Sequence, residues 1–256
     1  MRLRFLGTGA SFGVPVVGCE CESCSSEDHR DRRGRHALLL EDDGRRVLID
    51  APPELRLQLL REGIKDLGAV LISHPHADHI HGLDDLRVFT RGSRRLPMYV
   101  PAEFEEELRR RFGYVWSDGP RQPESSVPGL DVMPYGDGDT IQAAGFSITC
   151  VRLPHGIHFS YGFRVGRLGI LIDANRLPGP ARDVFSGIET LVVNALWFGR
   201  PHPGHFSMEQ AAELGASLGV RRTLITHIAH GTPHAEIARR LPSGSEPAFD
   251  GLRVEV

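Results

Sequence analysis

Residues 73–82 read Ser-His-Pro-His-Ala-Asp-His-Ile-His-Gly, and an apolar run at residues 69–72 leads into them. The segment from His74 to His79 holds three imidazoles and one carboxylate, the groups that first-row divalent metals take as ligands at catalytic sites. Because Asp78 and His79 are adjacent, their side chains diverge and can serve two ions. The alternative is a polar loop with scattered histidines, but such loops rarely carry this spacing directly after an apolar strand. The stretch therefore predicts a metal centre.

The composition is that of an ordinary globular protein. The chain has 256 residues, of which 40% are apolar and 25% charged, with a formal net charge of −3. This leaves room for a sizeable core and gives no sign of a basic nucleic-acid surface or a membrane-binding face. Apolar runs stay well short of the roughly 20 residues of a membrane span, and residues 1–7 lack the apolar region of a signal peptide. We therefore expect a cytoplasmic protein whose thiols stay reduced.

Apolar and alternating segments predict strands in two groups. The expected strands are residues 1–6, 36–41, 46–50, 69–73 and 98–100, then 147–153, 161–165, 170–173, 190–194, 223–226 and 252–256. The expected helices are residues 52–61, 102–111, 207–218 and 234–240. Residues 113–138, rich in Gly, Pro and Ser, give no clear pattern and are too short for a second domain. Two strand-rich halves with peripheral helices predict one α/β domain over residues 1–256, a four-layer αβ/βα sandwich.

Three further strands end in a residue able to bind metal. These residues are His155, Asp173 and His227, which follow the strand ends 153–154, 171–172 and 224–226. Because ligand sites in layered α/β sheets lie at strand ends, we expect all three to meet the His74 loop at one edge. The expected ligands are His74, His76 and His155 for one ion and Asp78, His79 and His227 for the other. Asp173 would bridge them, since a carboxylate has two oxygens and two metals about 3.5–4 Å apart can clamp a phosphoryl centre.

Three cysteines form a second group with metal-binding spacing. Cys19, Cys21 and Cys24 lie within six residues, in an irregular loop at about residues 13–26. In a reducing compartment they do not pair as disulfides, and tetrahedral zinc explains them better. The fourth ligand is either Cys150, which sits in an apolar strand and resembles a core thiol, or His230. His230 is the better candidate, and it would tie the cysteine loop to the edge that carries His227.

Several histidines remain outside these ligand sets. His205 lies in a loop before a capped helix, and a histidine without a metal beside a two-metal centre could protonate a leaving oxygen. His202, His158 and His81 are alternatives for that role. By contrast, His29, His36 and His234 read as ordinary surface or helix-cap residues, and we assign them no function.

Taken together, these motifs resemble the metallo-β-lactamase superfamily, and within it the PhnP-like phosphodiesterases of the carbon–phosphorus lyase pathway. The resemblance runs over nearly the whole chain and includes residues 7–9, 13–15, 18–21, 74–83, 161–162, 224–230, 242–244 and 249–251. It implies the ligand sets given above, with Asp50 orienting the metal loop and the cysteine trio with His230 holding structural zinc. Two departures stand out. Ala174 follows Asp173 where a threonine is usual, and residues 100–140 match poorly.

The resemblance implies a phosphodiesterase that depends on two divalent ions, Zn²⁺ or Mn²⁺, with Asp78 and His205 as catalytic residues. The substrate would be a small, cyclic phosphate diester such as 5-phosphoribosyl 1,2-cyclic phosphate or a related sugar or nucleotide diester. The alternatives are a tRNase Z-like nuclease, a lactonase or thioesterase on the same fold, and a PqqB-like accessory protein without enzymatic activity. Near-neutral charge argues against a nucleic-acid substrate. A homodimer is left open by the sequence.

Overall fold

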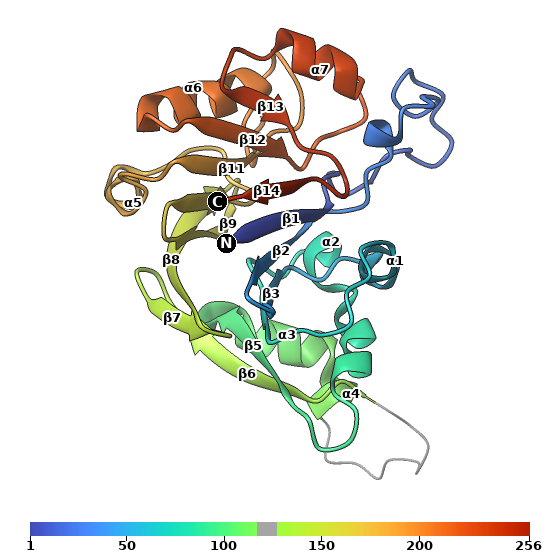
Figure 1. Ribbon diagram of the computed structural model, residues 1–256, viewed down its shortest axis with the longest axis vertical. Helices are drawn as coiled ribbons and strands as arrows, with labels where there is room; N and C mark the ends of the chain where they lie inside the picture. Colours follow the sequence, from blue (N-terminus) through green and yellow to red (C-terminus); the bar gives the residue numbers. More distant parts are fainter. Residues whose placement is uncertain (117–126) are drawn as a thin grey trace.

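Two seven-stranded sheets face each other in the computed structural model, which describes residues 1–116 and 127–256 (Figure 1). The first sheet has the order β14-β1-β2-β3-β4-β5-β6. Its strands are β1 (Arg2–Gly7), β2 (Ala37–Asp42), β3 (Arg45–Ile49), β4 (Ala69–Leu71), β5 (Leu96–Pro101), β6 (Leu130–Tyr135) and β14 (Arg253–Glu255). Because β14 pairs with β1, the two chain ends lie side by side in the same sheet.

The second sheet has the order β13-β12-β11-β10-β9-β8-β7. Its strands are β7 (Thr140–Ala143), β8 (Phe146–His155), β9 (His158–Val165), β10 (Leu168–Leu171), β11 (Thr190–Asn194), β12 (Arg222–Thr226) and β13 (Ser245–Pro247). In each sheet one half is parallel, β3 to β6 in the first and β10 to β13 in the second.

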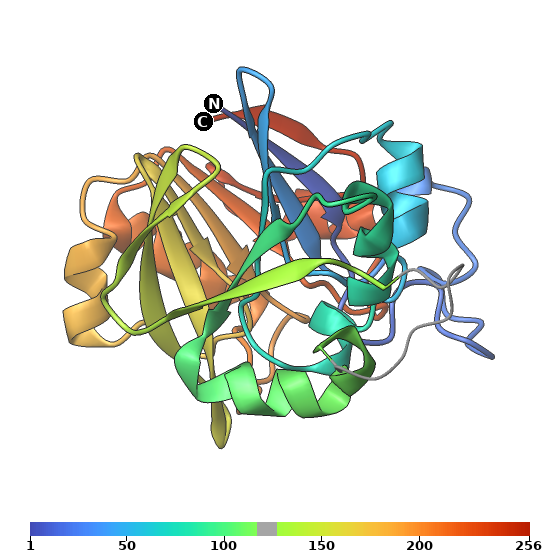
Figure 2. The same ribbon diagram turned by 90° about the horizontal axis from the view of Figure 1, so that it is seen from below.

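Helices cover the outer face of each sheet. The α-helices are α1 (Leu55–Arg61), α2 (Ala77–Ile80), α3 (Glu105–Arg111), α4 (Gly113–Trp116), α5 (Gly179–Val184), α6 (Met208–Leu218) and α7 (His234–Arg240). Short 3-10 helices are η1 (His29–Asp31), η2 (Leu83–Phe89) and η3 (Ala102–Phe104). Figure 2 shows α5 (orange) and α1 (cyan) on opposite sides of the two sheets.

Three apolar clusters explain this layering. One fills the space between the sheets, and the other two lie between each sheet and its helices. In β2, Leu38 and Leu40 face the space between the sheets while Leu39 faces the helices. Since both faces of the strand are buried, its sequence is an unbroken apolar run instead of an alternating one. The four-layer αβ/βα sandwich expected from the sequence is therefore confirmed.

The structure adds elements that the sequence patterns missed, among them β6, β7, β13, α2, α4 and α5. Strand β6 lies at the edge of its sheet, carries Pro134 and is half exposed, so it lacks the apolar alternation of an inner strand. Helix α1 begins at Leu55 and not at residue 52. Part of the unreadable stretch 113–138, residues 117–126, lies outside the described residues. Within the described residues, the helices are all too short or too polar to cross a bilayer.

Candidate metal centre

The site lies at one edge of the sandwich, where strands of both sheets end. His74 follows β4, His155 ends β8, Asp173 follows β10 and His227 follows β12. The backbone turns sharply there, with φ of 48° at Asp173 and 57° at His227. Residues other than glycine rarely adopt this left-handed conformation, which costs of order 1–3 kcal/mol. The chain accepts that strain because it turns each side chain into the edge directly after a rigid strand.

The first ligand group brings together four predicted residues. The Asp173 Oδ2 atom lies 3.5 Å from His74 Nε2 and 3.7 Å from His155 Nε2. The His76 Nδ1 atom lies 3.0 Å from His74 Nε2 and 3.3 Å from His155 Nε2. Two nitrogen or oxygen donors on one tetrahedral zinc, each about 2.0–2.1 Å from the metal, are about 3.4 Å apart. The four donors therefore have the spacing of ligands around one ion.

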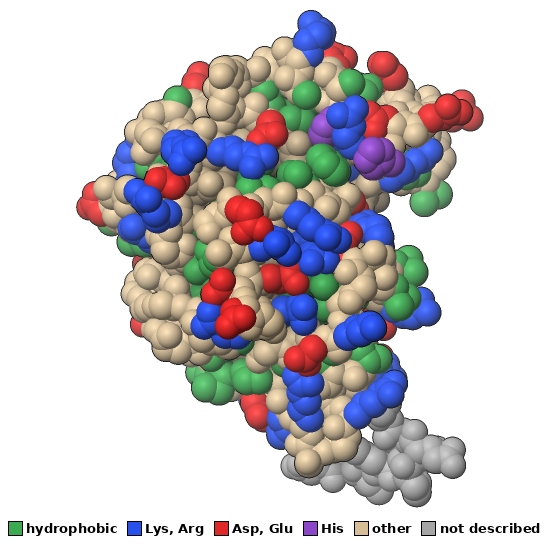
Figure 3. Space-filling view, viewed as in Figure 1, with side chains coloured by type: hydrophobic (Ala, Val, Ile, Leu, Met, Phe, Trp, Pro, Cys, Tyr) green, Lys and Arg blue, Asp and Glu red, His purple; other side chains and the backbone are tan. Residues whose placement is uncertain are grey.

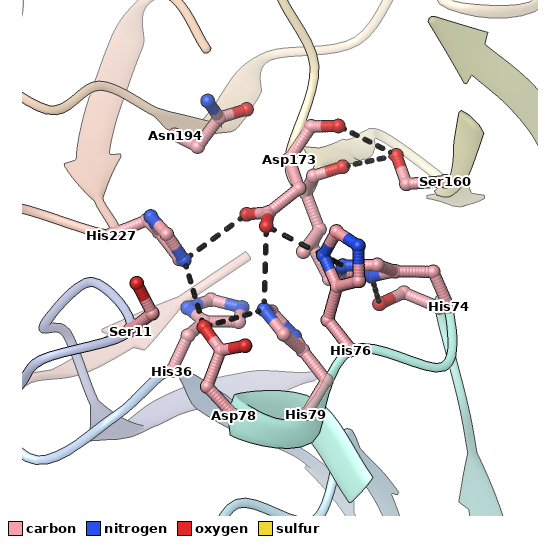
Figure 4. A network of polar contacts seen from close by, with 12 residues as sticks. Ser11, His36, His74, His76, Asp78, His79, Ser160, Asp173, Asn194 and His227 are labelled. Carbon is pink, nitrogen blue, oxygen red and sulfur yellow. Dashed lines mark hydrogen bonds and ion pairs between the residues drawn. The ribbon is translucent and has the colours of Figure 1, made fainter. Parts of the chain in front are cut away.

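The second group shares Asp173 with the first (Figure 4). The Asp78 Oδ2 atom is 3.5 Å from His79 Nε2 and 3.6 Å from His227 Nε2. Asp173 reaches both histidines, with Oδ2 3.4 Å from His79 Nε2 and Oδ1 3.2 Å from His227 Nε2. Asp173 therefore lies between the two groups and offers an oxygen to each, as expected for a bridging carboxylate.

The chemistry of these donors fits divalent metal. Within the described residues, His79 Nε2, His227 Nε2 and Asp173 Oδ1 are buried and make no well-directed hydrogen bond. Leaving such atoms without a partner is costly, and a bound cation would supply the missing partner. Burial raises the pKa of a carboxyl, but the neighbouring histidines overcome it and hold the pKa values of Asp78 and Asp173 well below their usual range. The site therefore keeps two anionic ligands.

Most of the ligand imidazoles are oriented by a bond on their second nitrogen. The Nδ1 atom of His74 lies 2.9 Å from Ser73 Oγ, and that of His79 lies 2.7 Å from Asp50 Oδ2. The Nδ1 atom of His155 lies 2.7 Å from the Gly204 carbonyl. Such bonds fix the ring orientation of a metal ligand. Asp50 also accepts bonds from Ser73 N and Oγ, both at 2.8 Å, so it lies where the sequence predicts an orienting residue.

His205 lies beside the second group, with its ring stacked 4.9 Å from that of His227 and its Nδ1 3.9 Å from Asp173 Oδ1. Its partner is Asn194, which the sequence analysis missed. Asn194 Oδ1 accepts the Ala174 N–H at 2.8 Å, so its Nδ2 is a donor facing His205 Nδ1 at 3.2 Å. His205 Nδ1 is therefore an acceptor, and the proton of the neutral ring is on Nε2. Burial lowers the pKa of His205 to about 3, although Asp173 partly opposes this.

The competing histidines lie around the site in different ways. The His202 ring is 5.0 Å from His205, the His158 ring is 5.9 Å from His76, and His81 packs against Phe112 at 6.0 Å. His36 and His234 are both buried, so the interpretation of them as surface residues is wrong, although His234 does begin α7. Each lies where two distant segments meet, which the local sequence does not reveal.

The cysteine group forms a separate cluster. The Nδ1 atom of His230 lies 3.3 Å from the sulfurs of Cys19 and Cys21 and 3.6 Å from that of Cys24. Sulfur and nitrogen ligands on one tetrahedral zinc are about 3.6 Å apart. Burial raises the pKa of Cys21, but the Cys24 N–H and His230 outweigh it and lower that pKa to about 6. Cys150 is instead buried between the sheets, so His230 completes the cluster.

Comparison with known proteins fits this geometry. A family model described as a beta-lactamase superfamily domain matches residues 45–228. The chain belongs to the metallo-β-lactamase superfamily. A crystal structure described as a new diphosphatase from the PhnP family superposes with a TM-score of 0.90 at 35% identity, covering 100% of this chain and 97% of that one. The resemblance to PhnP-like proteins seen in the sequence is thereby confirmed.

Two curated relatives are named for other activities. The chain is 34% identical to an octanoyltransferase of Porphyromonas gingivalis over 254 residues, covering 98% of this chain and 51% of that protein. It is 31% identical to a ribonuclease Z of Bradyrhizobium sp. over 168 residues, covering 63% of this chain and 48% of that protein. The chain thus spans about half the length of the curated relatives it matches. The similarity shows the family and leaves the reaction to be proposed.

Proposed function

We propose that this protein hydrolyses a phosphorus–oxygen bond in a small phosphate diester, using two divalent ions. The observation that carries the proposal is the pair of ligand groups that share Asp173 at spacings suited to metal. Two ions bound there, Zn²⁺ or Mn²⁺, would supply Lewis acidity and activate water for attack on phosphorus. All seven expected ligands lie at this edge, which argues against a non-catalytic PqqB-like role.

The chain's own residues would position the substrate and assist the leaving oxygen. Asp78 and Asp173 supply two negative charges at the centre, and Asp50 and Ser73 hold the metal loop. We propose that His205 donates a hydrogen bond from Nε2 to the leaving oxygen, because Asn194 occupies its Nδ1. A positively charged His205 ring would carry a hydrogen on Nδ1 as well, and this hydrogen would point at the Asn194 Nδ2 group, which is itself a donor. Full proton transfer from His205 therefore requires Asn194 to move, and the general-acid role stays a prediction.

Two substrate types follow from the relatives and the sequence. The motif resemblance implies a cyclic sugar phosphate such as 5-phosphoribosyl 1,2-cyclic phosphate, whereas the 35% identical structure is described as a diphosphatase. In both, the bond to be broken joins phosphorus to an oxygen shared with a second group. That oxygen is an ester oxygen in the cyclic phosphate and an anhydride oxygen in the diphosphate. A long nucleic acid is a poorer fit. On the face seen in Figure 3, acidic side chains lie among the basic ones, so this face carries no continuous basic surface for a phosphate backbone.

The test is a substrate panel assayed with added Mn²⁺ or Zn²⁺. It should contain 5-phosphoribosyl 1,2-cyclic phosphate, a nucleotide diphosphate ester, bis-(4-nitrophenyl) phosphate, a phosphate monoester, a lactone and a thioester. We expect turnover of one or both diester types and much slower turnover of the monoester. Hydrolysis of the lactone or thioester without diesterase activity would disprove the proposal. The ratio between the first two substrates decides between a cyclic ester and a diphosphate.

We also propose that Cys19, Cys21, Cys24 and His230 hold one structural zinc ion. Three sulfurs and one nitrogen complete a tetrahedral shell, which leaves no position for a substrate. His230 lies three residues after His227, so the cluster would hold the segment that carries a catalytic ligand. Reduced thiols are expected in the cytoplasm, where we expect the protein to act.

A further inference from the structure

His36 is a buried histidine that belongs to neither ligand group. It stands directly before β2, is 1% exposed, and its Nδ1 lies 3.1 Å from the Thr226 hydroxyl. Among the described residues, its Nε2 has no hydrogen-bond partner. A leucine here would fill the core without the desolvation cost of an imidazole. In the described structure, the bond to Thr226 is the interaction that offsets this cost.

That bond joins the two sheets at the point where the second ligand group is assembled. Asp78 and His79 lie on α2, which follows β4 of the first sheet, while Asp173 and His227 follow strands of the second sheet. The spacing of these four ligands therefore depends on how the two sheets are held together at this edge. His36 precedes a strand of the first sheet, and Thr226 ends a strand of the second.

The backbone just after His227 is already hydrogen-bonded to the segment that follows β1 of the first sheet. Ile228 N donates to the Thr8 carbonyl at 2.9 Å, and Ala10 N donates to the Ile228 carbonyl at 3.1 Å. The His36–Thr226 bond supplies the matching connection just before His227. The strained backbone of His227, with φ of 57°, thus lies between two attachments to the first sheet.

His227 also needs this support more than His74, His79 and His155 do. The imidazoles of His74, His79 and His155 each have a bond on Nδ1, whereas His227 Nδ1 is without a hydrogen-bond partner in the described structure. The ring of His36 lies 6.3 Å from that of His227 and 6.0 Å from that of His79. Figure 4 shows it next to the Asp78, His79 and His227 side chains. With no direct bond, the orientation of His227 depends on its backbone and its packing.

We propose that His36 is a positioning residue that clamps the end of β12 through Thr226 and so sets the affinity of the second ligand group for its ion. The inference rests on the proposed two-ion centre. It assigns to His36 the support that a direct hydrogen bond gives His74, His79 and His155. Loss of such support typically weakens metal affinity about 10–100-fold.

The experiment measures metal binding by His36→Leu, His36→Asn and Thr226→Val. Metal-free protein is titrated with Co²⁺, and the visible spectrum follows the His/Asp centre separately from the sulfur-rich cluster. We expect His36→Leu and Thr226→Val to lower the affinity of the second ligand group for Co²⁺ about tenfold. The affinity of the first ligand group should stay nearly unchanged. Asparagine places an amide near the Nδ1 position, so His36→Asn should restore most of the affinity. The double variant should be no worse than either single variant.

Gln58→Leu is the matched control. Gln58 is also 1% exposed, and its side chain donates to the Arg35 carbonyl at 2.8 Å, next to His36 in the chain. This variant should melt at a lower temperature but bind both Co²⁺ ions like the parent. Parent-like affinity in both His36→Leu and Thr226→Val would overturn the clamp. If His36→Leu does not fold, parent-like affinity in Thr226→Val alone overturns it. Failure of the parent to bind two ions at the His/Asp centre would instead disprove the proposed function.

Discussion

The two clusters of metal-ligating side chains are built in opposite ways. The His/Asp centre draws its ligands from strand ends of both sheets, and most of these ligands are buried. The cysteine cluster takes three ligands from one short loop and one from His230. Around that loop the core gives little support, since Phe12 is 75% and Val17 102% exposed. The first cluster is therefore positioned by the fold, whereas the second would use its metal to position the loop.

This difference predicts different responses to mutation. At the His/Asp centre, removing a ligand should impair the chemistry and leave the sandwich folded, because three apolar clusters hold the sheets and helices. At the cysteine cluster, removing a ligand should loosen local structure and reach the chemistry only indirectly. Metal binding and folding are coupled most strongly where little else orders the chain.

The largest effect is expected for Asp173→Ala. This variant removes the carboxylate that contacts both ligand groups, so at least one ion should be lost and kcat/KM should fall about 1000-fold or more. Elemental analysis and a diesterase assay measure the two effects. The melting temperature of the metal-free protein should change little. Full metal content together with full activity would show that Asp173 does not bridge.

A smaller loss is expected for His205→Gln. If His205 assists the leaving oxygen, kcat should fall about 100–1000-fold while the metal content stays that of the parent. The matched control is His202→Gln, which changes a half-buried histidine 5.0 Å away and should cost less than about tenfold. A larger loss of kcat in His202→Gln than in His205→Gln would show that His202, and not His205, assists the leaving oxygen.

Cys21→Ser tests the cysteine cluster. We expect it to release one zinc equivalent and to lower Tm by about 5–10 °C, with less than about a tenfold loss of activity. Cys150→Ser is the control, since Cys150 lies in the core and should not affect zinc content. Parent-like zinc content and Tm in Cys21→Ser would mean that the cluster binds no metal.

The smallest effect concerns pH and His234, which lies near the segment following the cysteine loop. The His234 Nδ1 atom is 3.1 Å from Arg33 Nη2, and the His234 backbone N–H donates to Asp31 Oδ1 at 2.7 Å. Burial, followed by Arg33 and Arg30, lowers the pKa of His234 from 6.5 to about 4, against the opposing effect of Asp28 and Asp31. The unfolded chain therefore binds more protons between these values, and stability falls as pH drops from about 6.5 toward 4.

This contribution is at most about 3.5 kcal/mol, because one pKa unit corresponds to about 1.4 kcal/mol. The measurement is the difference in Tm between the parent and His234→Gln as a function of pH. The parent should lose stability faster than the variant below about pH 6.5, and the two curves should run parallel above it. His29→Gln, at an exposed position, should show no such difference. Parallel curves over the whole range would rule out the contribution of His234.

The sequence alone determined the class of fold and the local ligands. The His74 loop is readable because four ligands fall within six residues after an apolar strand, so no distant contact is needed to recognise it. Most core strands were readable because sheets buried on both faces require apolar runs, as in β2. The cysteine trio was recognised in the same way, from spacing within one loop.

Only the tertiary structure decided what lies against these segments. The pairing of β14 with β1 and the contacts of Asn194 with His205 and of His36 with Thr226 join separate segments of the chain. The preference for His230 over Cys150, already favoured by the sequence, is likewise met by packing, which brings His230 to the cysteine trio. Each of these side chains is unremarkable within its own segment. Its role depends on which partner the packed sheets bring within about 3–4 Å, and that distance is set by the whole core and not by local sequence.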